Sequence, residues 1–123
     1  MGTAGDNRPS VRCCIENWWN HDSIKQISKQ YFGDSEGSHA TCSEVALTYF
    51  GYPKHGERVS QNILSPKIAP KGPIYDASDY RRRFADGRIG SDPSLATPEI
   101  GEKLFEAAVD GIGQSFIEFV DAE

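Results

Sequence analysis

Residues 97–120 read TPEIGEKLFEAAVDGIGQSFIEFV and form the clearest structural element of the sequence. Thr97 is suited to the N-cap of a helix, and Pro98 fits the first helical position. Apolar residues then recur at helical spacing on one face, namely Ile100, Leu104, Ala108, Ile112, Phe116 and Phe119. The stretch therefore predicts a long amphipathic helix, in which Gly111 and Gly113 each cost roughly 1 kcal/mol relative to alanine.

Upstream of this helix, end signals predict three shorter ones. His21-Asp22-Ser23 offers an N-cap for a helix over residues 24–31, and Gly33 would end it. A second helix is expected over residues 41–50, and a third over residues 76–84. The rest of residues 52–98 is rich in proline and glycine and is expected to be irregular, which in a compact domain usually indicates a function or a docked segment.

The beginning of the chain gives weaker signals. Residues 1–10 are small, polar and without period, so we expect a disordered lead-in followed by a single domain over residues 11–123. Val11, Cys13 and Ile15 alternate with polar or smaller residues, which predicts a short strand running into Trp18 and Trp19.

Composition limits the class of protein. The chain has 123 residues, of which 37% are hydrophobic and 25% charged, as in one ordinary globular domain. A net charge of −5 argues against a general nucleic-acid binder, and no apolar run is long enough for a membrane span or a secretory signal. Three cysteines without a C-x-x-C spacing favour reduced thiols in a cytoplasmic protein.

The segment Gly37-Ser38-His39-Ala40 precedes the second predicted helix and holds the best catalytic candidate. A histidine beside a helix N-terminus meets the positive end of the dipole, which favours a neutral ring suited to a general base. A histidine that only caps the helix or bonds to a backbone carbonyl is the more common outcome. Glu44 could orient His39, but Thr41-x-x-Glu44 is also a capping box, and capping is the better-supported role.

Other candidates are weaker. Cys42 and His39 could form a nucleophile and base, although a buried structural cysteine is far more common. Trp18 and Trp19 could line a pocket for a flat ligand, and in a strand only one of them could face it. The three histidines lack a metal-ligand spacing.

The only basic cluster is Arg81-Arg82-Arg83. It could bind phosphate, RNA or a carboxylate of another subunit. From residue 99 onward the chain holds seven acidic residues and one lysine, so the acidic C-terminal helix is its expected partner, within the chain or between subunits.

Three motifs in order carry a family resemblance. Gly37-Ser38-His39-Ala40, with Glu44 five residues after the histidine, resembles the G-x-H-A-x-x-x-E stretch of the creatininase (creatinine amidohydrolase) family. Residues 86–101 resemble the closing G-x-x-G-x-P…A-x-x-E-x-G segment of that family, and the early Asn17-Trp18-Trp19 also fits. The resemblance covers most of residues 11–120.

This resemblance implies an α/β fold, part of a three-layer structure with a mainly parallel sheet flanked by helices. It implies metal-dependent hydrolysis of a cyclic amide or related C–N bond, with zinc or manganese as the divalent metal and a small-molecule amide as substrate. His39 would be the acid/base residue and Glu44 would orient or cap, while Trp18 or Trp19 would line the substrate pocket. The family also implies a homo-oligomer, usually a hexamer.

The family's metal-ligand motifs, an early E-x-H…D region and an N-G-H-x-E-N-like loop, are not found in the sequence. We therefore expect the C-terminal half of such an enzyme, incomplete at the N-terminus, without metal ligands and inactive alone. The partner would be the missing N-terminal half or further copies of the chain. The alternative is a non-catalytic oligomerisation or interaction module from a truncated or split gene.

Overall fold

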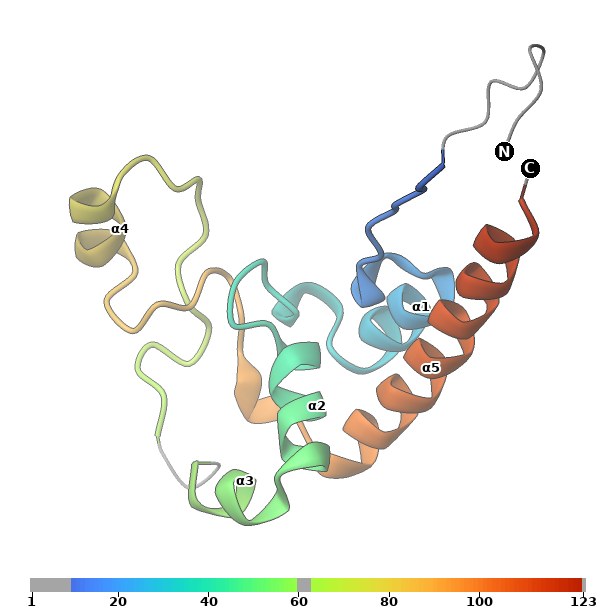
Figure 1. Cartoon of the computed structure of the whole chain (residues 1–123). Helices are drawn as coiled ribbons and strands as arrows, with labels where there is room; N and C mark the ends of the chain where they lie inside the picture. Colours follow the sequence, from blue (N-terminus) through green and yellow to red (C-terminus); the bar gives the residue numbers. More distant parts are fainter. Residues whose placement is uncertain (1–9, 60–62, 123) are drawn as a thin grey trace.

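The computed structural model describes residues 10–59 and 63–122, which fold mainly as helices around one long C-terminal helix (Figure 1). The α-helices of this part are α1 (Asp22–Tyr31), α2 (Cys42–Gly51), α3 (Pro53–Val59), α4 (Ala77–Arg83) and α5 (Pro98–Asp121). Short 3₁₀ helices complete it: η1 (Trp18–Asn20), η2 (Gly33–Ser35) and η3 (Pro93–Leu95). In Figure 1, α1 and α2 lie along α5, while α4 stands apart at the other end of the molecule.

The expected α/β fold with a mainly parallel sheet is wrong for the described residues. They are 61% helical and contain no strand, only an isolated antiparallel bridge between His39 and Ile89. The strand predicted over residues 11–19 is also wrong, because Val11 and Ile15 are 74% and 90% exposed and no neighbouring segment pairs with them. A strand needs a partner as well as an alternating pattern, and three alternating positions do not supply one.

The caps at the start of α5 and α4 are confirmed, whereas α1 begins at Asp22 after His21, which forms no side-chain cap. Thr97 accepts a hydrogen bond from the Ile100 amide at 3.2 Å, and the side chain of Asp76 accepts one from the Asp79 amide at 2.7 Å. Gly33 follows α1 with a φ of +54°, the left-handed conformation that ends many helices. The expectation of irregular chain from residue 52 is wrong over α3, where a proline occupies the first helical position and so begins a helix instead of breaking one.

The core lies where α2 crosses α5. Cys42, Ala46 and Leu104 have no exposed surface, and the same cluster includes Ile24, Phe32, Tyr49, Ala96 and Ala108. The helices approach very closely at Gly101, where an added Cβ would lie 2.0 Å from the Ala46 carbonyl oxygen. Only glycine fits this crossing, which packs α5 against Ala46 and Phe50 of α2.

The apolar stripe of α5 is buried only in its first half. Leu104 and Ala108 are buried, whereas Ile112 and Phe116 are 38% and 65% exposed. We call the exposed large apolar side chains of this helix the outer α5 face: Phe105, Val109, Ile112, Phe116, Ile117 and Val120. Beside its last turn, the Arg12 guanidinium donates to the carbonyl oxygens of Phe119 and Ala122 at 3.2 and 2.8 Å.

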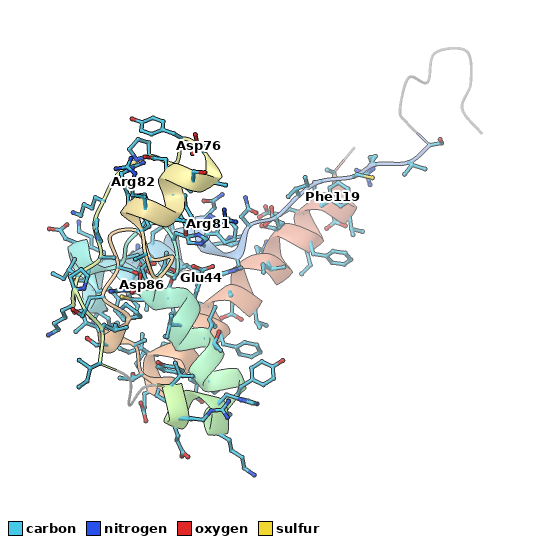
Figure 2. All side chains as sticks on the ribbon, turned by 90° about the vertical axis from the view of Figure 1, so that its left-hand side faces the viewer. Glu44, Asp76, Arg81, Arg82, Asp86 and Phe119 are labelled. Atoms are coloured by element: carbon cyan, nitrogen blue, oxygen red, sulfur yellow. The ribbon has the colours of Figure 1, made fainter. Side chains whose placement is uncertain are left out.

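The basic cluster does not meet the acidic end of α5. Figure 2 shows Arg81 and Arg82 on α4, far from Phe119 near the end of α5, and Figure 1 separates the two helices in the same way. Arg82 and Arg83 instead pair with Asp79 of their own helix, each at 2.6 Å. The expected partnership within the chain is therefore wrong, because the intervening loop carries α4 away from α5.

Candidate functional site

A hollow of about 890 Å³ opens between η1, α1, the loop of residues 33–41 and the start of α2, and we call it the main hollow. It brings together all four residues predicted to form a site, Trp18, Trp19, His39 and Glu44. The remaining lining residues are Ile24, Lys25, Ser28, Lys29, Gly33, Asp34, Glu36, Gly37, Ser38, Thr41 and Ser43. It therefore has aromatic walls and a polar floor, the composition typical of a small-molecule site.

Both tryptophans line the main hollow. They belong to η1, and their rings lie 5.8 Å apart in an edge-to-face arrangement at 88°. The expectation that only one of them could face a pocket is wrong, because it assumed a strand. In a 3₁₀ helix neighbouring side chains differ in direction by about 120°, so two consecutive residues can border the same space.

His39 is held by its backbone while its ring stays accessible. The Ser38 amide donates to the Ile89 carbonyl at 2.9 Å, and the Ile89 amide donates to the His39 carbonyl at 3.2 Å. The imidazole lies edge-on to the Tyr80 ring, with centroids 6.0 Å apart. Within the described residues neither ring nitrogen has a hydrogen-bond partner, so the ring is available to a ligand.

Gly37 explains how this loop reaches residues 89–91. It adopts a φ of +75°, and an added Cβ would lie 2.6 Å from the Ile89 carbonyl oxygen and from the Ser91 amide nitrogen. Both the conformation and the space therefore require glycine. Because the approach fixes the backbone two residues before the histidine, Gly37 is a positioning residue for His39.

Glu44 caps α2. Its Oε2 accepts from the Thr41 amide and the Thr41 hydroxyl, each at 3.0 Å, and its own amide donates to Thr41 Oγ1 at 3.2 Å. The capping box expected from the sequence is therefore confirmed. Of the two roles left open for Glu44, the structure supports capping, which fixes the first turn of α2 next to His39.

Glu36 forms the floor of the main hollow and was not singled out by the sequence. Its carboxylate accepts from Ser28 Oγ at 2.9 Å, from the Ser43 amide at 2.8 Å and from Ser43 Oγ at 2.6 Å. It thus joins α1 to the N-terminus of α2. Its partners are seven and eight residues away, a spacing that no local motif describes.

Cys42 is structural. Its Sγ lies 3.0 Å from the Ser35 carbonyl oxygen and 3.1 Å from the Asp92 carbonyl oxygen, so the two oxygens share its one S–H proton, and the side chain is fully buried. Burial raises the pKa of the Cys42 thiol to about 12, so the thiolate needed for nucleophilic attack does not form near neutral pH. The cysteine-hydrolase interpretation therefore fails on both access and ionisation.

Two lysines of the main hollow were also missed. Lys25 and Lys29 are exposed, lie four residues apart on α1 and border the same space as the tryptophans. The signal was present in the sequence, because residues at this spacing in a predicted helix share one face.

A smaller hollow of about 340 Å³ lies on the other side of His39. His39 and Glu44 line it together with His55, Gly56 and other residues of α2 and α3. His39 thus stands between two hollows, whereas His55 borders only the smaller one.

The described residues do not fit a metal centre by themselves. They contain no group of three or more histidine, cysteine, aspartate or glutamate side chains placed to hold a metal ion. Within the main hollow, the carboxylates of Glu36 and Glu44 already accept hydrogen bonds from neighbouring serine and threonine residues.

The sequence matches the family model described as Creatininase: Creatinine amidohydrolase over residues 2–116. The chain belongs to the creatininase family. Its members are amidohydrolases that generally bind a divalent metal. Because the match extends over nearly the whole chain, it does not support the expectation that only the C-terminal half of a creatininase is present.

No curated protein matched the chain in a sequence comparison. None of the helices in residues 10–59 and 63–122 combines the length and apolar character needed to cross a membrane. The expected disordered lead-in falls on residues outside the described ranges, apart from Ser10.

Proposed function

We propose that this creatininase-family chain hydrolyses a cyclic amide or a related C–N bond in the main hollow, with His39 as the acid/base residue. The observation that carries the proposal is the position of His39 in the same hollow as Trp18 and Trp19. The histidine ring is accessible there, while the cysteine nearest to it is buried and protonated.

The chemistry follows from these side chains. A flat amide ring packs against the indoles, which supply a large apolar contact area. Hydrolysis adds water to the carbonyl carbon and breaks the C–N bond, and the leaving nitrogen takes up a proton. His39 accepts the proton that water loses and returns it to that nitrogen, a transfer that contributes typically 10²–10⁴-fold to the rate.

No step above is assigned to a metal, because the described residues offer no group of three ligands. The zinc or manganese ion expected from the family would be held with ligands from a further polypeptide. That polypeptide would be a second copy of the chain or a missing N-terminal half, and the assembly would form in the cytoplasm.

Isolation of the assembly tests the proposal. The chain is tagged at its C-terminus in the cells that make it, purified, and assayed by mass spectrometry for ring opening of creatinine, hydantoin and dihydrouracil. We expect turnover and bound metal in the assembly, and neither in the chain produced alone. If the assembly opens none of the three rings, the proposed reaction class is contradicted. If the isolated chain binds metal tightly and is fully active, the need for a further polypeptide is contradicted.

Trp18→Ala provides a second readout in the same assay. If the indole packs against the amide ring, KM rises severalfold while kcat falls less, because the lost contact serves ground-state and transition-state binding alike. An unchanged KM contradicts the proposed placement of the substrate.

The outer α5 face favours a second candidate, a non-catalytic oligomerisation module. Phe116 and Val120 are 65% and 55% exposed on a helix whose first apolar turns are buried, and a second copy of the chain would cover them. Light scattering after size exclusion tests this candidate. We expect an oligomer that Phe116→Ser with Val120→Ser dissociates and that Glu106→Ser, a change at an exposed acidic position of α5, does not. A wild-type monomer contradicts it.

A further inference from the structure

Lys25 and Lys29 place two positive charges at one border of the main hollow. Four residues apart on a helix, their side chains project from the same face about 6 Å apart. Within residues 10–59 and 63–122, neither ammonium group forms an ion pair. Both cations are therefore free to meet a charge that arrives with a ligand.

The aromatic and cationic features border the same space. Trp18 and Trp19 offer apolar surface for a flat ring, and the two lysines line the same hollow. A ring that lies against the indoles can therefore carry a substituent toward α1. The amide hydrolysis proposed above uses the ring and leaves the lysines without a role.

The acidic residues of the hollow limit the charge of that substituent. Glu36 and Glu44 are held by hydrogen bonds from Ser43 and Thr41, and Asp34 borders the same hollow. Three carboxylates in one hollow repel a doubly charged phosphate more strongly than a single carboxylate. A monoanionic substituent is therefore the better match to the two lysines.

We propose that the main hollow selects cyclic amides that carry a carboxylate, with the ring against Trp18 and Trp19 and the carboxylate between Lys25 and Lys29. The inference rests on the proposed function and names the substrate class of the same site. The lysines are binding residues, since they meet the substituent and not the bond that breaks.

Tryptophan fluorescence reports this site directly, because both tryptophans of the sequence line the main hollow. The matched probes are 5,6-dihydrouracil and its 6-carboxylate, dihydroorotate, which differ by one carboxylate on the same cyclic amide. We expect dihydroorotate to bind the full chain about fivefold more tightly at low ionic strength, from two exposed ion pairs. Added salt should reduce this preference, because the pairs are solvent-exposed.

Three variants assign the preference to the lysines. Lys25→Gln with Lys29→Gln should bind dihydrouracil and dihydroorotate with equal affinity. Lys103→Gln, at an exposed lysine of α5 outside the hollow, should keep the wild-type preference. Asp34→Asn should increase it, because one repelling carboxylate is removed.

Equal affinities in the wild type, or a preference that persists in the double lysine variant, overturns the inference. Equal binding of both probes still leaves the hollow as a cyclic-amide site, so that result does not contradict the proposed function. If the preference for dihydroorotate depends on the lysines but the assembly opens no ring, the carboxylate site is supported and the proposed reaction is contradicted. If neither probe changes the fluorescence, the carboxylate site is overturned, whereas the proposed reaction is tested separately by ring opening in the assembly.

Discussion

Gly101→Ala should destabilise the protein, although alanine is the better helix former. The new Cβ would lie 2.0 Å from the Ala46 carbonyl oxygen, 2.6 Å from its carbon and 2.9 Å from Phe50 Cβ. Ordinary contact begins near 3.4 Å, so α2 and α5 must separate by about 1 Å or more. This separation loosens a core in which Leu104 and Ala46 have no exposed surface.

The magnitude follows from two opposing effects. Forcing extra volume into a packed core costs about 1–3 kcal/mol, and the contact with rigid backbone places this site near the upper end. Alanine returns about 1 kcal/mol through its helix propensity. We therefore expect the free energy of unfolding to fall by about 2 kcal/mol, which lowers the urea midpoint by about 1 M.

Gly113→Ala is the matched control on the same helix. Nothing lies within 4 Å of the methyl group that alanine would add there, so only helix propensity acts and stability should rise by about 1 kcal/mol. Urea unfolding followed by far-UV circular dichroism measures both variants. If Gly101→Ala stabilises the protein as Gly113→Ala does, the described crossing of α2 and α5 is refuted.

Three further predictions concern single side chains. At pH 8 a thiol reagent should modify the exposed Cys13 and Cys14 of the native protein but not Cys42, because burial raises the pKa of the Cys42 thiol to about 12. Modification of all three cysteines without denaturant contradicts this prediction. Glu36→Gln should lower the free energy of unfolding by about 2 kcal/mol, because hydrogen bonds to the charged carboxylate are lost. Urea unfolding measures this loss and should show little change for the control variant Glu106→Gln. The hydrogen bond from Arg83 holds the pKa of Asp79 below its usual range. The ionised Asp79 carboxylate therefore stabilises the folded protein above its unfolded-state pKa of about 3.9. This stabilisation is lost as the pH falls through the lower pKa that Asp79 has in the folded protein. An NMR titration in which Arg83→Gln leaves that pKa unchanged would exclude this cause.

The parts of the fold that depend on local chemistry could be predicted from the sequence. Thr97, Thr41 and Asp76 each satisfy amides within three residues, so their caps are visible in the sequence and the helices follow from them. The sheet, by contrast, is predicted only by the family resemblance and by a three-residue alternation. Strand pairing is a non-local property, and residues 11–17 have no strand beside them to pair with in the described structure.

The candidate site shows the same division. The histidine loop, the tryptophan pair and the capping glutamate were visible as motifs, and the structure brings them to one hollow. Glu36 and the thiol of Cys42 were not, because their roles arise from contacts across the fold, such as the bond from Cys42 to Asp92 fifty residues away. The stripe of α5 predicted a buried face, but in the second half of the helix Ile112 and Phe116 remain exposed.

The central claim is that His39 transfers the proton during amide hydrolysis. The direct test compares kcat for ring opening by assemblies that carry His39→Ala or His55→Ala, since His55 borders only the smaller hollow. The account predicts a 10²–10⁴-fold loss for His39→Ala and a change of less than about threefold for His55→Ala. Equal rates for wild type and His39→Ala would contradict it.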